Sequence, residues 1–188
     1  MENRLSAFEV NPIIAAVKNE EQLETAIHTD CSIIFFLFGN ICNISELVKK
    51  AKDAGKLAFV HIELTTGLAG KEVAVDFIKN FTQADGIISI KPSLIKRAKV
   101  LGMLTVLRIF LVDSLALTNL SKQIAACDAD IIEIMPGVMP KIIRRVKELV
   151  DVPVIVGGLI TDKEDIMNAL SAGAQCISTT HEVAWKEF

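Results

Sequence analysis

The chain has 188 residues, about half of them apolar, which is enough for one domain with a hydrophobic core, so we expect a single domain over residues 1–188. No uncharged apolar stretch is long enough to cross a membrane, and the first residues lack the apolar run of a signal peptide, so we expect a cytoplasmic protein. The formal net charge of −3 gives no overall basic field, so any contact with nucleic acid must depend on local patches.

Short apolar runs rich in Val, Ile and Phe alternate with amphipathic stretches along the whole chain. This alternation is typical of repeated βα units, in which both faces of a parallel sheet are buried. The eight predicted strands cover residues 12–17, 32–38, 57–64, 86–90, 104–112, 131–135, 154–156 and 175–178. Predicted helices between them include 44–54, 72–80, 141–149 and 163–172.

Eight such units predict an α/β fold, a TIM-like parallel β/α barrel. Each unit averages only about 23 residues, below the roughly 30 of an ordinary barrel, so we expect a compact barrel with some short or missing helices. Gly55, Gly102 and Gly173 stand where helices should end before the next strand. Thr161 and Glu164 form a predicted capping box, in which Thr161 caps the helix and Glu164 reaches back.

The cysteines show no CxxC pair and no histidines at metal spacing, so the sequence predicts neither a metal site nor a cofactor. They are interpreted as buried, unpaired thiols of a reducing compartment: Cys31, Cys42, Cys127 and Cys176.

Small residues end the last two predicted strands. Gly157 and Gly158 follow the seventh strand, and Thr179 and Thr180 follow the eighth. Paired glycines allow the backbone to approach an anion, and loops after strands seven and eight form the recurrent phosphate site of such barrels. We therefore predict a phosphate site here. The alternative is that the two glycines only make a tight turn.

Charged residues gather at the other predicted strand ends. Lys91 and Arg108 could neutralise a phosphate, while His61, Glu63 and Glu133 could meet sugar or polyol hydroxyl groups. Strand alternation in the predicted 57–64 strand places His61 and Glu63 on one face. The alternative for Glu133 is an ion pair with Arg108 or Lys91, which could also line a pocket.

Three further interpretations remain open. Asp113, before Ser114, is better explained as a helix cap than as a ligand contact. His61 could act as a general base, although a lone histidine is more often structural. Lys91 could form a Schiff base, which keeps an enzyme hypothesis open, but no catalytic motif is present in the sequence and we predict no catalytic residue.

Two basic stretches could contact an RNA backbone. One contains Lys96, Arg97 and Lys99, and the other contains Lys141, Arg144 and Arg145. The alternative for each stretch is a solvated helix face, which is common in proteins without nucleic-acid partners.

Several phrases, in order and at matching spacing, resemble the glycerol uptake operon antiterminator regulatory proteins of bacteria over nearly the whole chain. The phrases include 108–114 (RIFLVDS), 132–137 (IEIMPG), 157–160 (GGLI) and 172–174 (AGA). The chain departs from the family pattern at Ile90 and Leu107, where polar residues are common, and this could change hydrogen bonding to a polyol or to RNA.

The resemblance implies a barrel that recognises glycerol 3-phosphate as its effector. It also implies binding to leader mRNA of glycerol utilisation genes, so that transcription continues past a terminator. A homo-oligomer is possible. Two alternatives stay open: a small phosphate-metabolising TIM-barrel enzyme of aldolase, isomerase or phosphodiesterase type, and a metabolite sensor that acts through protein contacts alone.

Overall fold

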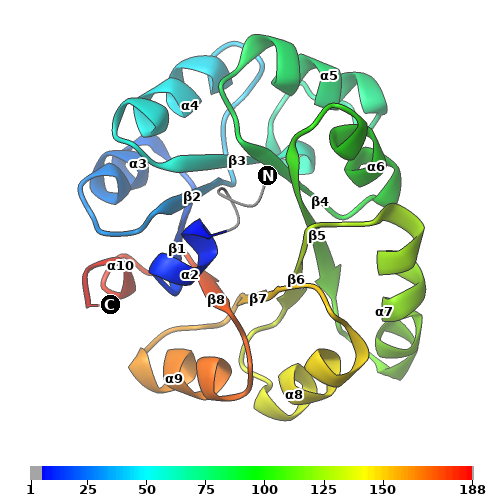
Figure 1. The fold of residues 1–188 in the computed structure, drawn as a ribbon. Coiled ribbons are helices and arrows are strands. Elements are labelled where there is room, and N and C mark those ends of the chain that lie inside the picture. The colour runs from blue at the N-terminus through cyan, green and yellow to red at the C-terminus, as the bar shows by residue number, and fades with distance from the viewer. Residues whose placement is uncertain (1–5, 188) are drawn as a thin grey trace.

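The computed structural model describes residues 6–187, which form a closed barrel of eight parallel strands with helices outside it (Figure 1). The strands are β1 (Ile13–Val17), β2 (Ile33–Phe36), β3 (Leu57–His61), β4 (Gly86–Ser89), β5 (Leu104–Phe110), β6 (Ile131–Met135), β7 (Val154–Gly157) and β8 (Cys176–Thr179). Each strand pairs with its neighbours in sequence, and β1 closes the barrel on β8. The predicted TIM-like barrel is confirmed.

A helix follows every strand, so none is missing from the βα units. The outer helices are α3 (Glu20–Ile27), α4 (Ile44–Asp53), α5 (Glu72–Phe81), α6 (Pro92–Val100), α7 (Ser114–Cys127), α8 (Pro140–Leu149), α9 (Lys163–Ser171) and α10 (Ala184–Glu187). The barrel is compact because most of these helices have only 8 to 10 residues and the last has four. No helix within residues 6–187 is long and apolar enough to cross a membrane.

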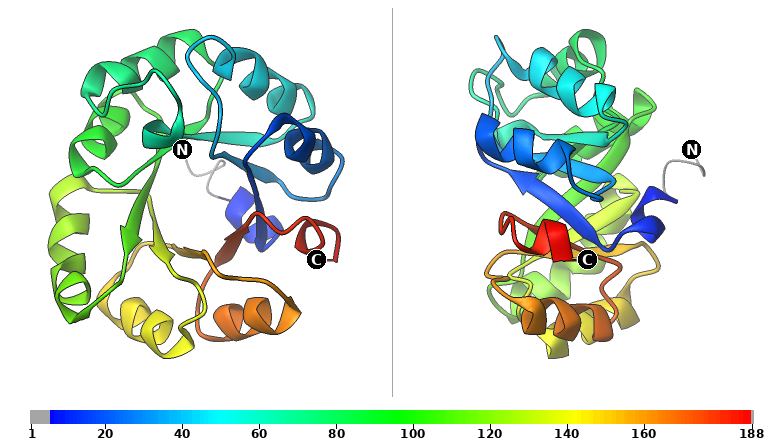
Figure 2. Two further views of the ribbon diagram at one scale, coloured as in Figure 1. Left: turned by 180° about the vertical axis from the view of Figure 1, so that it is seen from behind. Right: turned by 90° about the vertical axis from the view of Figure 1, so that its left-hand side faces the viewer.

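Two apolar layers hold the barrel together, because alternate strand residues face inward and outward. The inner cluster includes Phe35, Phe59 and Ile88, and the outer cluster packs the strands against the helices. The short helix α2 (Ala7–Val10) closes one end, where the ring of Phe8 meets that of Phe59 edge-on at 5.7 Å. In the side view of Figure 2, α2 lies at the end opposite to the one toward which the strands point.

The two departures from the family pattern lie in different surroundings, and the alternation explains the first of them. Leu107 is fully buried in the outer cluster and faces the helices, so it does not face the barrel mouth. Ile90 lies just beyond β4 and is exposed. Leucine at position 107, where the family pattern has a polar residue, therefore leaves the interior of the barrel unchanged.

The helix ends show one confirmed prediction and one error. Gly55, Gly102 and Gly173 all have positive φ, as helix-ending glycines should. The cap of α9, however, is Asp162, whose Oδ1 accepts from the Asp165 amide at 2.9 Å. The predicted capping box of Thr161 and Glu164 was therefore one residue early. The residue that reaches back is Asp165, whose Oδ2 accepts from the Thr161 amide at 3.0 Å.

All four cysteines are free thiols, but one of them is not buried. Cys31, Cys127 and Cys176 are buried as predicted, and burial raises the pKa of Cys176 to about 12. Cys42 is exposed, because it lies in the turn that precedes α4.

Candidate ligand-binding site

A layer of polar side chains lies at the carboxyl ends of the strands. Each member stands two positions beyond an apolar residue of the inner cluster, so the period of two directs both to the same inward face. The four buried members are His61 on β3, Arg108 on β5, Glu133 on β6 and Ser178 on β8. Buried polar groups need partners, and the partners found here define the site.

Glu133 is fully buried and holds Arg108 in place. Its Oε2 accepts from Arg108 Nε at 2.6 Å, and its Oε1 accepts a short hydrogen bond from Ser178 Oγ. The ion pair with Arg108, one of the two interpretations of Glu133, is confirmed. Because both carboxylate oxygens are engaged below the mouth, Glu133 positions Arg108 and does not border the pocket above it.

Arg108 borders a pocket of about 100 Å³ at the mouth of the barrel. The other lining residues come from the ends of β1, β2, β6, β7 and β8: Ala16, Leu37, Met135, Gly158, Leu159, Ile160, Ser178, Thr179 and Thr180. Of the three guanidinium nitrogens of Arg108, only Nε donates a hydrogen bond within the described chain. The N–H groups of both terminal nitrogens are therefore available to a ligand. A guanidinium fixed in this way suits a phosphate or carboxylate.

The loop after β7 adds backbone donors. Gly158 has a φ of +77°, and the exposed Leu159 has a φ of +60°, a conformation that is uncommon for a branched side chain. The amides of Leu159, Ile160 and Thr180 donate no hydrogen bond to any other described residue. The loop is therefore a tight turn, as one interpretation held, and it also presents unbonded amides beside Arg108.

Gly157 lies under the pocket and does not line it. A Cβ at this position would stand 2.3 Å from Ser178 Oγ and 3.0 Å from Glu133 Oε1. Glycine is thus needed here for close packing against the polar layer, and of the four predicted phosphate-site residues only Gly158, Thr179 and Thr180 border the pocket.

The side chains of His61 and Glu63 are neighbours, but they do not lie on one strand as predicted. The strand β3 ends at His61, and Glu63 lies in a 3-10 helix, η1 (Ile62–Leu64), so the prediction that one strand carries both was wrong. His61 Nδ1 lies 3.4 Å from Glu63 Oε2, and these two buried atoms have no hydrogen-bond partner in the described chain. Ser89 Oγ donates to the other oxygen of Glu63 at 2.6 Å.

Burial, together with the nearby charge of Arg108, lowers the pKa of His61 from 6.5 to about 3. The imidazole is therefore neutral near pH 7 and is a poor general base there, since an efficient base has a pKa close to the working pH. Neutral His61 can still accept or donate a hydrogen bond to a ligand hydroxyl group.

This lowered pKa predicts a loss of stability in acid. Between about pH 6.5 and 3 the unfolded chain binds a proton at His61 that the folded chain does not, so stability falls as the pH falls through that range. Measured by urea unfolding, wild type should lose about 3 kcal/mol more than His61→Gln between about pH 7 and 4. The exposed His28 provides the control, His28→Gln. Parallel pH profiles for wild type and His61→Gln would contradict the assignment.

Lys91 is not brought to the pocket. Its side chain is exposed, and its Nζ donates to the carbonyl oxygen of Gly70 at 3.3 Å. No lysine borders the mouth pocket among the described residues, so the geometry offers no amine for a Schiff base there. Asp113 is a helix cap, since its Oδ1 accepts from the Ala116 amide at 2.7 Å.

Two side chains that the sequence did not indicate hold the loop after β8. Gln22 Nε2 donates to the Thr180 carbonyl oxygen at 3.3 Å, while its Oε1 accepts from the Lys18 amide at 2.9 Å. The buried Trp185 donates from Nε1 to the Thr179 carbonyl oxygen at 2.9 Å. No local motif could have revealed Gln22, because its partner Thr180 lies 158 positions away.

We expect Gln22→Ala to weaken ligand binding without unfolding the protein. Of the two side-chain hydrogen bonds that are lost, the one to Thr180 holds the loop after β8, and its loss corresponds to about 1 kcal/mol, or roughly a fivefold weaker affinity if that loop contacts the ligand. Calorimetric titration with glycerol 3-phosphate, the effector that the resemblance implies, measures the change. The control is Gln123→Ala, on the far helix α7, and equal affinities for the two variants would contradict the positioning role of Gln22.

The two basic stretches differ in their partners. In α6, Arg97 forms an ion pair with Asp76, and Lys99 contacts Asp130 at 2.6 Å. Asp130 also accepts from the Thr105 amide, so Lys99 belongs to a structural link at the start of β5 and β6. Lys96 alone of the three predicted residues in this stretch is fully on the surface.

The second stretch lies on α8. Lys141, Arg144 and Arg145 are exposed, and none of them forms an ion pair within residues 6–187. The geometry therefore distinguishes the two stretches, because the charges of α8 are not neutralised by neighbouring carboxylates.

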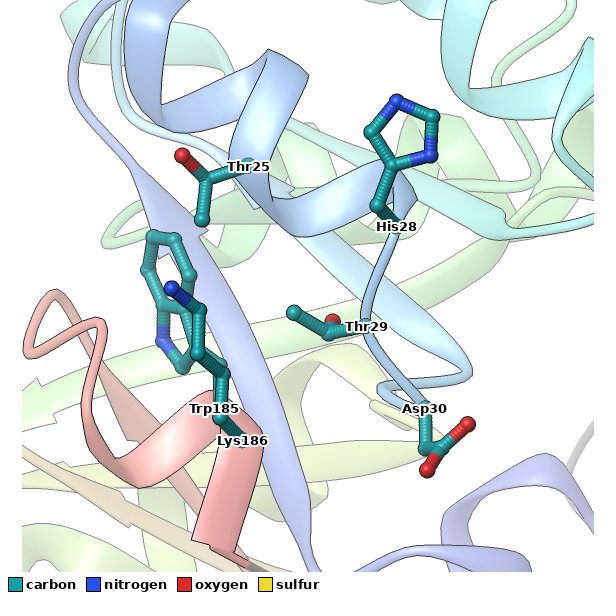
Figure 3. Close-up of a pocket in the computed structure, with 6 residues that line it drawn as sticks. All are labelled: Thr25, His28, Thr29, Asp30, Trp185 and Lys186. Atoms are coloured by element: carbon teal, nitrogen blue, oxygen red, sulfur yellow. The ribbon is translucent and has the colours of Figure 1, made fainter.

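A second pocket, of about 340 Å³, lies between α3 and the C-terminal helix (Figure 3). It is lined by Thr25, His28, Thr29, Asp30, Trp185 and Lys186. Thr29 and Asp30 precede β2, so this pocket lies toward the amino ends of the strands, away from the polar layer. It contains none of the predicted ligand-binding residues.

The fold and its polar layer define a β/α-barrel protein with a pocket at the carboxyl ends of the strands. The chain belongs to the glycerol-3-phosphate responsive antiterminator family, whose model matches residues 13–185. It is 48% identical over 175 residues to the uncharacterized protein YgcP of Escherichia coli (strain K12), covering 93% of this chain and 92% of that protein.

Solved structures agree with this assignment. The glycerol uptake operon antiterminator regulatory protein of Listeria monocytogenes is 30% identical, with a TM-score of 0.92 over 96% of this chain and 98% of that one. A glycerol uptake operon antiterminator-related protein of Thermotoga maritima is 33% identical, with a TM-score of 0.83 over 93% of this chain and 98% of that one. Aldolase structures at 13% and 18% identity share the fold alone.

Proposed function

We propose that this protein is a transcription antiterminator that binds glycerol 3-phosphate and, in response, the leader mRNA of glycerol utilisation genes. The observation that carries the proposal is Arg108, held by a buried carboxylate with its terminal donors unbonded beside the amides of Leu159, Ile160 and Thr180. In the proposed complex these groups bind the phosphate of the ligand.

The glycerol part of the ligand would lie toward His61 and Glu63, which do not line the mouth pocket but of which His61 lies near Arg108. The unsatisfied atoms His61 Nδ1 and Glu63 Oε2 are 3.4 Å apart, and one hydroxyl group can donate to Glu63 Oε2 while it accepts from the N–H of His61 Nδ1. Buried polar atoms without partners are rare, and a ligand that satisfies them gains affinity. This contact would distinguish glycerol 3-phosphate from inorganic phosphate.

The size of the mouth pocket fits a small effector. Its volume of about 100 Å³ is below the 300–1,000 Å³ that is typical of sites for drug-sized ligands, which favours a three-carbon phosphate over a nucleotide. We propose binding without turnover, because His61 is a weak base near pH 7 and Lys91 is outside the pocket. A cytoplasmic location follows from a role in transcription.

Calorimetric titration tests the ligand assignment. Glycerol 3-phosphate should bind saturably, at least about tenfold more tightly than inorganic phosphate, since the hydroxyl contacts add at least one hydrogen bond to the carboxylate of Glu63, and such bonds contribute about 1.5–3 kcal/mol. Glycerol should bind weakly, because it lacks the charge that Arg108 attracts. Equal affinities for phosphate and glycerol 3-phosphate would refute the role of His61 and Glu63, and steady consumption of the ligand would favour an enzyme.

A further inference from the structure

The helix α8 combines exposed positive charge with a position next to the ligand site. Lys141, Arg144 and Arg145 recur at intervals of three and four residues, so they share one face of the helix. The one acidic residue within α8 is Glu148, one turn further on. An unneutralised basic face of this kind attracts a polyanion, and each contact with a phosphate releases a counterion.

A hollow beside this face adds contacts that a bare charged helix lacks. It has a volume of about 300 Å³ and lies between the starts of α7 and α8, with Arg145 in its wall. Its other lining residues are Leu111, Val112, Asp113, Ser114, Leu117, Met139 and Ile142. Val112 is exposed and the hollow is mainly apolar, so an unstacked base could lie there with its phosphate on the basic face.

The loop that leads into α8 is bonded to the loop of the ligand site. The Gly137 amide donates to the Gly158 carbonyl oxygen at 3.0 Å. Ile160 packs so closely on Gly137 that a Cβ there would stand 2.6 Å from Ile160 Cδ1. Because Gly158 and Ile160 both border the mouth pocket, a ligand that orders their loop also acts on the residues that precede α8.

We infer that the basic face of α8 is the RNA-binding surface, and that ligand binding at the mouth pocket controls it through the hydrogen bond between Gly137 and Gly158. The inference rests on the proposed function for the identity of both ligands. Coupling of this kind requires that glycerol 3-phosphate binds more tightly to the RNA-competent arrangement of α8. Figure 1 shows α8 between α7 and α9, on the outside of the barrel.

Charge reversal tests the surface. Labelled RNAs selected from a randomised pool by the wild-type protein with glycerol 3-phosphate serve as the probe. The test is a triple variant that carries Lys141→Glu, Arg144→Glu and Arg145→Glu. Its affinity for RNA should be lower by roughly 100-fold or more, and the slope of log affinity against log salt concentration should decrease in magnitude by about 2. Its affinity for glycerol 3-phosphate should stay unchanged.

The matched control reverses three exposed lysines on the α5–α6 side: Lys71→Glu, Lys79→Glu and Lys96→Glu. Its affinity for the selected RNAs should stay within about threefold of the wild-type affinity, because the change in net charge alone has only a small, nonspecific effect. Equal losses in both triple variants, or no loss in the α8 variant, would overturn the surface assignment. Failure of the wild-type protein to select any RNA, with glycerol 3-phosphate bound, would refute the proposed function itself.

Hydrogen exchange tests the coupling. On addition of glycerol 3-phosphate to the wild-type protein, amides of residues 137–145 should exchange more slowly, while those of α6 should not change. Slower exchange confined to the loop after β7 would show that the ligand binds without reaching α8, and this result would overturn the coupling while leaving the ligand assignment intact.

Discussion

Arg108→Met is expected to lower the affinity for glycerol 3-phosphate by more than about 100-fold, because it removes the one charged group that borders the pocket among the described residues. It should also destabilise the fold by about 3–5 kcal/mol, since Glu133 would remain as a buried carboxylate without its positive partner. Calorimetry measures the first effect and urea unfolding the second.

A double variant separates the two roles of Arg108. Adding Glu133→Gln to Arg108→Met removes the uncompensated charge and keeps an oxygen for Ser178, so most of the stability should return while binding does not. The control is Arg97→Met, which breaks a partly exposed pair with Asp76 and should leave ligand affinity unchanged. Recovery of binding in the double variant would show that Arg108 acts only as a structural partner of Glu133.

Gly158→Val is expected to abolish measurable binding of glycerol 3-phosphate. The φ of +77° at this position is strained for a branched residue, by about 1–3 kcal/mol, and the new Cβ would lie 2.7 Å from Met135 Cε. The strain displaces the loop that carries the amides of Leu159 and Ile160, and the contact displaces the flexible end of Met135, which lines the pocket. Calorimetry at saturating ligand measures the loss.

Gly55→Val is the matched control for backbone strain. Its φ of +76° is nearly the same, but no atom lies within 4 Å of its Cβ and it is at the end of α4, away from the pocket. The two variants should lose similar stability, and only Gly158→Val should lose binding. If both variants bind glycerol 3-phosphate as wild type does, the loop after β7 does not hold the phosphate.

Much of the site follows from the sequence because a barrel strand directs alternate residues inward. Arg108 and Glu133 stand two residues beyond buried apolar positions, so their inward direction was predictable, and their pairing was one of the two ion pairs that the sequence allowed. Of the two glycines at the end of the seventh strand, only Gly158 borders the pocket, and phosphate binding at its loop stays a prediction.

Other parts of the site depend on where strands stop and on distant contacts. Glu63 meets His61 through η1, and periodicity cannot show that a strand ends at His61. Lys91 was expected at the pocket because it follows β4, but its long side chain turns to Gly70. In α6 the charges of Arg97 and Lys99 are neutralised by carboxylates from other elements, and composition alone could not reveal those partners.

The most direct test of the central claim is transcription in vitro on a template with a glycerol-gene leader and its terminator, with readthrough measured with and without glycerol 3-phosphate. The account predicts that the wild-type protein raises readthrough only when the ligand is present, and that Arg108→Met does not. Readthrough that is unchanged by protein and ligand together, under conditions where calorimetry shows the ligand bound, would contradict it.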